Sequence, residues 1–122
     1  MREKIKPIEG FPNYFVDSKG TVYTTTISPR YNPNGELRVL QPRNHPSGYL
    51  YVGFYTGKKG EKRKWRRVHR LVAENFIGEI PFGYEVDHKD GNRTNNDVSN
   101  LRIVTHRENV LLGFQRRNNG KK

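Results

Sequence analysis

The stretch EVDHKDGNRTNNDVSNLRIVTHREN, from Glu85 to Asn109, holds a dense polar segment between two short apolar runs. Its pattern predicts a strand over residues 84–88, a polar loop, a second strand over 101–105 and then a helix. Thr105 followed three residues later by Glu108 is the sequence pattern of a capping box, which starts a helix. The stretch therefore predicts a hairpin that leads directly into a helix, with polar side chains at the junctions.

Two interpretations of the polar loop fail on spacing. If Gly91 occupied the sixth position of an EF-hand calcium loop, Val86 would fall at the first position, where valine cannot bind a cation. The tripeptide NRT at residues 92–94 matches the signal for N-glycosylation. The first residues, MREKIKPIEG, contain no apolar signal core, so we treat this match as chance. We expect neither a calcium loop of this kind nor a glycosylated turn.

An ordinary polar turn accounts for residues 90–96, since Asn and Asp bond their own backbone and tolerate turn conformations. It does not account for Asp87 and His88, which end the first predicted strand. Neighbours on a strand point to opposite sides, so one could face a metal ion and the other a substrate phosphate. Asn109 falls in the first turn of the following helix. Because carboxylate and amide oxygens suit Mg²⁺ or Mn²⁺, Asp87 and Asn109 are possible ligands of one divalent cation.

The 122-residue chain is strongly basic, with 23 Lys and Arg against 12 Asp and Glu and a net charge of +11. Much of this excess lies between residues 58 and 70, and seven Tyr and six Phe accompany it. Phosphates attract positive charge and bases stack on aromatic rings, so nucleic acid is the expected partner. The length is that of one domain, or of a small domain with an extension.

The sequence contains no Cys, which excludes disulfides and thiolate zinc sites and fits a reducing cytoplasm. No apolar run approaches the roughly 20 residues that a membrane helix needs. We therefore expect a cytoplasmic protein with no membrane association.

The clearest alternation in the chain is YLYVGFY at residues 49–55, which predicts a strand with two different faces. One face carries the tyrosines, and Leu50, Val52 and Phe54 form the other, which we expect to be buried. A turn and the segment RKWRRV complete a hairpin. If Trp65 joins the buried face, the flanking Lys64 and Arg66 share the tyrosine face. The residues expected to contact DNA are Tyr49, Tyr51, Tyr55, Lys62, Lys64, Arg66, Arg67 and Arg70.

Two helices and one further hairpin are also predicted. The helix over residues 68–78 follows from apolar positions spaced for one helical face, and it carries His69. The helix after Thr105 has an apolar stripe formed by Val110, Leu111 and Phe114. A hairpin over residues 14–25 turns at Asp17-Ser18-Lys19-Gly20, where glycine permits positive φ.

The segment VDHKDGNRTNNDVSNLRIVTHREN resembles the HNH nuclease motif of phage- and intron-borne homing endonucleases. VHRLVAENFIG also resembles those enzymes, and KPIEGFPNYFVDSKGTVYT resembles a module often placed before HNH domains. The likeness runs from about Lys4 to Asn109. It implies an α+β fold, with an N-terminal antiparallel sheet region followed by a C-terminal ββα-metal unit. We place the β-rich, DNA-contacting region at residues 1–66 and the HNH region at 67–122.

The resemblance also implies roles for individual residues. Asp87 and Asn109 match the outer motif positions, which hold the metal ion. His88 matches the general base, and Asn100 matches the asparagine that ties the hairpin together and orients the histidine. Because the outer positions are Asp and Asn rather than His, Mg²⁺ or Mn²⁺ is expected instead of zinc or nickel. His69 and His106 are assigned supporting roles.

The function implied is a metal-dependent endonuclease that nicks double-stranded DNA and leaves a 5′ phosphate and a 3′ hydroxyl. We expect a monomer or weak dimer of the homing type, encoded by a phage or an intron. Two alternatives stay open at this point. The chain could be a basic DNA-binding module without catalysis, or a small basic RNA-binding or structural protein. Metal-dependent cleavage of DNA would distinguish the endonuclease from both of these alternatives.

Overall fold

The computed structural model describes residues 4–119 and has the expected α+β architecture. The strands of the first part are β1 (Ile5–Ile8), β2 (Phe11–Asp17), β3 (Val22–Thr24), β4 (Arg38–Leu40), β5 (Arg43–Asn44), β6 (Leu50–Phe54) and β7 (Lys64–Arg67). Then follow α1 (Val68–Phe76), β8 (Tyr84–His88), the short 3-10 helix η1 (Val98–Asn100), β9 (Leu101–Thr105) and α2 (His106–Asn119). No helix in the described range 4–119 combines the length and apolar character needed to cross a membrane.

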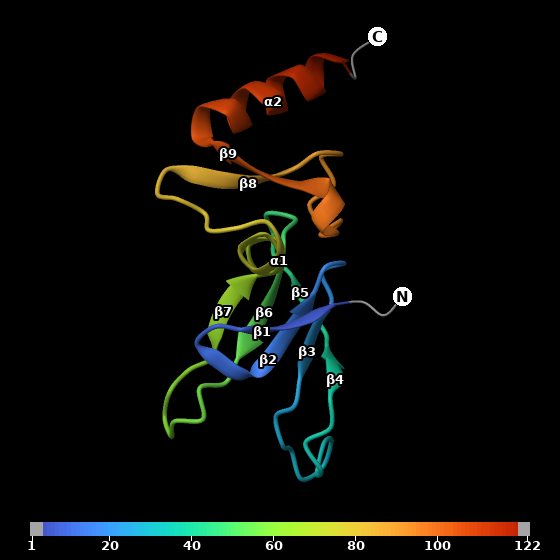
Figure 1. Cartoon of the computed structure of the whole chain (residues 1–122), viewed down its shortest axis with the longest axis vertical. Coiled ribbons are helices and arrows are strands. Elements are labelled where there is room, and N and C mark those ends of the chain that lie inside the picture. Colours follow the sequence, from blue (N-terminus) through green and yellow to red (C-terminus); the bar gives the residue numbers. More distant parts are fainter. Residues whose placement is uncertain (1–3, 120–122) are drawn as a thin grey trace.

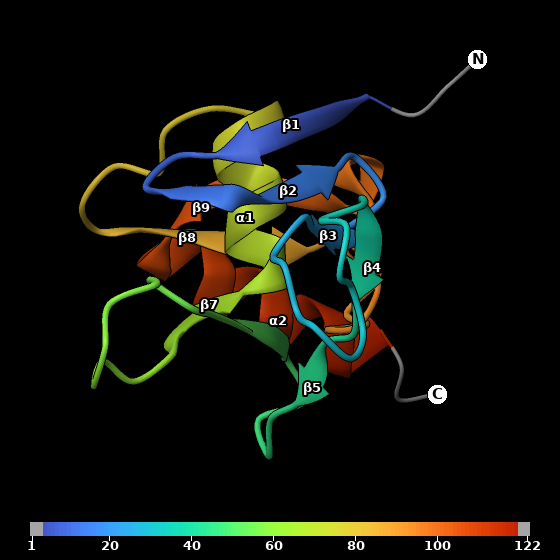
Figure 2. The ribbon, with the colours of Figure 1, turned by 90° about the horizontal axis from the view of Figure 1, so that it is seen from below.

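The strands form three antiparallel sheets arranged around α1. The first sheet has the order β1-β2-β3-β4, the second β5-β6-β7, and the third is the β8-β9 hairpin. Figure 1 shows α1 between the two larger sheets and the β8-β9 hairpin, with α2 on the far side of that hairpin. Seen from below, the two larger sheets lie in front of β8, β9 and α2 (Figure 2).

One apolar core connects all of these layers. Helix α1 contributes Val68, Leu71, Val72 and Ala73, which is the face that its spacing predicts. The same cluster includes side chains from β2, β6, β8 and β9, namely Tyr14, Val16, Val52, Phe54, Val86 and Leu101. The hairpin that carries the polar stretch is therefore fixed to the N-terminal strands through a shared core.

Trp65 does not join the buried face, so the condition that would place Lys64 and Arg66 beside the tyrosines is not met. In the β6-β7 pair Trp65 lies opposite Gly53, so its ring is on the tyrosine face and 38% of it is exposed. A Cβ atom on Gly53 would come within 3.0 Å of that ring, so the glycine makes room for the indole. Lys64 and Arg66 consequently lie on the other face, and Arg66 covers the ring of Phe11.

Helix α2 begins as its sequence predicts but does not bury its apolar stripe. The backbone N–H of Thr105 donates to Glu108 Oε1 at 3.0 Å, and the N–H of Glu108 donates to Thr105 Oγ1 at 3.1 Å. These bonds are the two halves of a capping box. Val110, Leu111 and Phe114 are each about half exposed, so the stripe that the sequence indicates is largely open to solvent.

Candidate active site

The β8-β9 hairpin brings Asp87 and His88 to the centre of the molecule. In its register Asp87 lies opposite Arg102, and His88 lies opposite Leu101. Both side chains are only 4% exposed, although they end a strand next to a polar loop. Buried polar groups of this kind need partners, and each of the two has its own.

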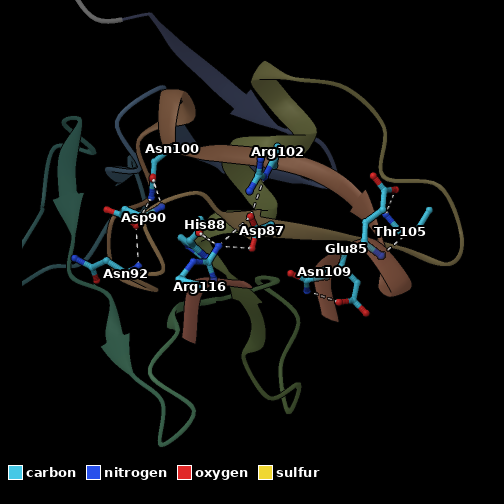
Figure 3. A network of polar contacts seen from close by, with 11 residues as sticks. Glu85, Asp87, His88, Asp90, Asn92, Asn100, Arg102, Thr105, Asn109 and Arg116 are labelled. Atoms are coloured by element: carbon cyan, nitrogen blue, oxygen red, sulfur yellow. Dashed lines mark hydrogen bonds and ion pairs between the residues drawn. The ribbon is translucent and has the colours of Figure 1, made fainter. Parts of the chain in front are cut away.

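Asp87 is held by two arginines (Figure 3). Arg102 Nε donates to its Oδ2 at 2.9 Å, and Arg116 Nη2 lies 3.3 Å from Oδ1 and 3.5 Å from Oδ2. Arg116 reaches across from α2 and also donates to the carbonyl oxygen of His88 at 3.1 Å. The carboxylate is thus held by one guanidinium from β9 and one from α2.

The imidazole of His88 is fixed by a hydrogen bond and by rings. Its Nε2 lies 2.7 Å from Oδ1 of Asn96, a buried residue of the polar loop. The ring centroid lies 5.1 Å from that of His69 and 5.9 Å from that of Tyr49. The sequence assigned Asn96 to ordinary turn chemistry, so its contact with His88 is a correction.

Asn100 holds the loop together, which is part of the role implied by the motif. Its Oδ1 accepts from the backbone N–H of Asp90 at 3.1 Å, and its Nδ2 donates to Asp90 Oδ1 and to the Asn95 carbonyl, each at 2.9 Å. The hydrogen-bond partner of the His88 ring is Oδ1 of Asn96 instead. The two asparagines thus divide the role that the resemblance gives to one.

Asn109 lies in the first turn of α2 and faces the hairpin. Its Nδ2 donates to Glu85 Oε1 at 2.6 Å, and His106 Nδ1 lies 2.5 Å from Glu85 Oε2. These hydrogen bonds hold the pKa of Glu85 below its usual value, and the bond from Asn109 is the larger cause. The side chain of His106 is 73% exposed, and it pairs with Glu85 at the edge of the site.

A cavity of about 350 Å³ joins three of the predicted catalytic and metal-binding residues. Asp87, His88 and Asn109 all line it, together with residues that include Tyr49, Arg93 and Arg116. His69, His106 and Asn100 are not among its lining residues. The hairpin and the first turn of α2 therefore meet at one concave site, as the sequence predicts.

The donor atoms at this cavity fit a hard divalent cation held by few protein ligands. Within residues 4–119 no cluster of three or more His, Cys, Asp or Glu side chains is arranged to hold a metal ion. One carboxylate, Asp87, and one amide, Asn109, remain, and Mg²⁺ typically uses one or two such ligands together with water and substrate phosphates. Because Asn109 Nδ2 is bonded to Glu85, its Oδ1 is the atom left for a cation.

Comparison with known proteins identifies the family. Residues 66–111 match a family model described as HNH endonuclease. The chain is 37% identical over 106 residues to the DNA endonuclease I-HmuI of Bacillus phage SP01, covering 86% of this chain and 54% of that protein. A solved structure described as DNA binding and cleavage by the HNH homing endonuclease I-HmuI matches with a TM-score of 0.74 at 37% identity. The chain belongs to the HNH endonuclease family.

The likeness to I-HmuI covers most of this chain but only part of that protein. The I-HmuI structure is matched over 93% of this chain and 59% of that one. YosQ, from the SPbeta prophage of Bacillus subtilis (strain 168), is 52% identical over 66 residues, or 54% of this chain and 37% of that protein. The chain thus spans between 37% and 59% of the length of these relatives.

His69 is packed inside the HNH region and lies against the site rather than in it. It is 4% exposed, Tyr49 stacks on it at 4.7 Å, and its Nδ1 has no hydrogen-bond partner among the described residues. Burial lowers its pKa to about 3, with smaller contributions from His88, Arg67 and Arg70. His69 is therefore a neutral ring at physiological pH.

This lowered pKa predicts acid sensitivity of the fold. The unfolded chain binds a proton at His69 below about pH 6.5 and the folded chain does not, so the free energy of unfolding falls as pH drops from 6.5 toward 3. Between pH 7 and pH 5 this one group costs about 2 kcal/mol. The measurement is a denaturant titration at both pH values. On going from pH 7 to pH 5, the free energy of unfolding should fall by about 2 kcal/mol less in His69→Phe than in the wild type. An equal loss in both proteins would contradict this assignment.

The basic and aromatic residues occupy more than one surface. Tyr51, Trp65 and Arg67 share the exposed face of β6-β7, where Tyr51 and Trp65 rings lie 4.8 Å apart. Arg67 and Arg93 both lie over the Tyr49 ring, at 5.2 and 4.7 Å, and so connect this face to the cavity. Of the other predicted residues, Tyr55 pairs with Arg63, Lys62 lies exposed in the β6-β7 loop, and Arg70 pairs with Glu74.

Proposed function

We propose that this chain is a metal-dependent DNA endonuclease that hydrolyses phosphodiester bonds. The observation that supports it most strongly is the single cavity lined by Asp87, His88 and Asn109. A cation ligand pair and a buried histidine in one basic cleft are the parts that phosphodiester hydrolysis needs. The relative I-HmuI is named a DNA endonuclease, and its solved structure is described as DNA binding and cleavage.

In this proposal each residue has one task. Asp87 and Asn109 hold the divalent cation, Mg²⁺ or Mn²⁺. When bound, the cation neutralises charge that develops on the phosphate and on the leaving 3′ oxygen. His88, as a neutral imidazole, takes a proton from the attacking water, so that the products are a 5′ phosphate and a 3′ hydroxyl. Asn100 keeps the loop closed around the hairpin.

One active site in one chain fits nicking of a single DNA strand. The assay is conversion of supercoiled plasmid to the open-circular form in the presence of Mg²⁺ or Mn²⁺. We expect open circles to form first, to carry 5′ phosphates, and to be absent when EDTA replaces the metal ion. Binding without cleavage under all metal conditions would instead support the non-catalytic DNA-binding alternative.

Double-stranded DNA is proposed to lie across the exposed β6-β7 face and the adjoining cavity. Tyr51 and Trp65 supply rings, and Arg67 and Arg43 lie over neighbouring rings where phosphates can reach them. This surface replaces the tyrosine, Lys64 and Arg66 combination expected from the sequence, because Lys64 and Arg66 point to the opposite side.

Removing the indole should weaken DNA binding more than it slows cleavage. An aromatic contact of this kind contributes about 1–3 kcal/mol, so Trp65→Ala should raise the Kd for DNA by about 5- to 150-fold. The nicking rate at saturating DNA should change much less. Phe82→Ala is the matched control, because Phe82 is a fully exposed aromatic residue in the connector before β8. Equal Kd values for Trp65→Ala and wild type would exclude this face.

A further inference from the structure

Asn96 is only 4% exposed, although residues 91–94 of the same loop are all exposed. Asn and Asp in turns usually bond the nearby backbone and face solvent. Asn96 instead directs its side chain at the imidazole of His88, with Oδ1 2.7 Å from Nε2. This contact between a buried amide and the candidate base is not explained by turn formation alone.

The chemistry of the two groups decides which atom donates in this hydrogen bond and which accepts. An amide oxygen accepts hydrogen bonds and cannot donate them. A neutral imidazole carries its proton on one nitrogen and a lone pair on the other, so a bond from Nε2 to Oδ1 requires the proton on Nε2. The lone pair then stands on Nδ1. The partner of one ring nitrogen thus decides which nitrogen can act as a base.

We propose that Asn96 is a positioning residue that holds His88 as the Nε2–H tautomer, and that the β2-β3 turn is the wall that holds Asn96. The first half leaves Nδ1 as the nitrogen that accepts the proton from water. The second half makes the N-terminal strands a working part of the active site. The effect of both halves on catalysis rests on the proposed nuclease function. The tautomer of His88 and the packing of the turn on Asn96 do not depend on it.

The wall is built from a turn that is itself tightly fixed. Gly20 has φ +92°, and a Cβ placed on it would lie 2.8 Å from Asn96 Cβ and 3.1 Å from its carbonyl oxygen. Two residues further along the loop, the Val98 N–H donates to the Ser18 carbonyl at 2.8 Å. Asp17, only 2% exposed, accepts from the backbone N–H groups of residues 19 and 21 and so holds the turn in shape.

Closing the loop does not require Asn96. Asn100 already binds Asp90 through two hydrogen bonds and the Asn95 carbonyl through a third, while Asn95 Nδ2 donates to Asp90 Oδ2 at 2.9 Å. These bonds join the two ends of the loop whatever stands at position 96. The described side-chain hydrogen bond of Asn96 serves His88, and its backbone rests on Gly20.

The tautomer can be read directly, without DNA or metal. Two-bond ¹⁵N–¹H correlation spectra at about pH 8.5, well above the ~6.5 of an unperturbed imidazole, distinguish a protonated from an unprotonated ring nitrogen. The His88 signals are assigned by their loss in His88→Gln. We expect Nε2–H in the wild type, the same in Asn96→Asp, which keeps an acceptor, and a mixture of tautomers in Asn96→Ala. Asn92→Ala, an exposed loop variant, should match the wild type.

Nδ1–H in the wild type would overturn the first half, and so would an unchanged tautomer in Asn96→Ala. In plasmid nicking, Asn96→Ala should be about 10- to 100-fold slower, the range for groups that orient an active-site side chain. Asn96→Asp should recover much of that loss. If the wild type shows the expected tautomer but never nicks DNA, the nuclease proposal fails and the geometric assignment stands.

The contact between the β2-β3 turn and Asn96 can be tested by substituting two glycines that have similar φ angles. Gly10 and Gly20 both have positive φ, at +85° and +92°, so alanine is strained at either position. Only at Gly20 would the new Cβ meet Asn96, because a Cβ on Gly10 has nothing within 4 Å. We expect Gly20→Ala to shift the His88 ring signals and slow nicking several-fold more than Gly10→Ala, at equal folded fractions. Equal effects of the two variants would overturn the second half.

Discussion

His88→Ala is expected to slow plasmid nicking by about 10²- to 10⁴-fold, the contribution that a general base usually makes. The reason is that no other described side chain lining the cavity carries an imidazole nitrogen beside Asp87 and Asn109. The measurement is the single-turnover rate at saturating DNA and Mg²⁺. Because His88 is buried, the folded fraction and the Kd for DNA are measured alongside, and both should stay close to the wild type.

Asn92→Ala is the control for this variant. Asn92 belongs to the same polar stretch, but its side chain accepts from Thr94 within an exposed turn. It should nick at close to the wild-type rate. A His88→Ala protein that binds DNA, stays folded and cuts like the wild type would remove His88 from the mechanism and favour a non-catalytic role for the site.

The elements that carry the site were predictable because their signals are local. The strands at residues 84–88 and 101–105 and the capping box at Thr105 and Glu108 each depend on residues within one or two turns of chain. All three are present as predicted. The positions of Asp87, His88 and Asn109 follow from them, which is why these three residues meet in one cavity.

The faces of β7 were not predictable from alternation alone. A period of two separates neighbouring residues onto opposite faces but does not say which face is buried. The register that pairs Trp65 with Gly53 decides it, and this pairing depends on the loop between β6 and β7. The glycine among the tyrosines was the one available signal, since a missing side chain leaves room for a large ring on the next strand.

Asn96, Arg102 and Arg116 were all missed, and for Asn96 and Arg116 the reason is that their roles depend on tertiary contacts. Asn96 reads as a turn residue until the β2-β3 turn is seen to press on it. Arg116 reaches Asp87 from the far end of α2, which is 29 residues away in the chain. Arg102 was within reach of sequence reasoning, because a hairpin with strands at 84–88 and 101–105 places it opposite Asp87.

Asp87→Asn should abolish most of the nicking while leaving the fold largely intact. Loss of a cation ligand removes several kcal/mol of transition-state stabilisation, on the order of 10³-fold in rate. Arg102 and Arg116 lose their partner, but their side chains are 38% and 36% exposed and can be hydrated. We therefore expect a small change in the free energy of unfolding beside a large loss of activity.

Arg116→Gln should act on the same carboxylate in the opposite direction. Its guanidinium and a divalent cation both neutralise Asp87, so they compete for one charge. A partly exposed ion pair is worth about 1 kcal/mol or less, so the Kd for Mn²⁺ should fall by up to about fivefold. Calorimetric titration with Mn²⁺ in the absence of DNA separates this effect from any phosphate contact. Asp87→Asn and Asn109→Ala should both bind Mn²⁺ more weakly than the wild type. If all three variants bind Mn²⁺ as the wild type does, the cation lies elsewhere and the assignment of Asp87 and Asn109 as its ligands is wrong.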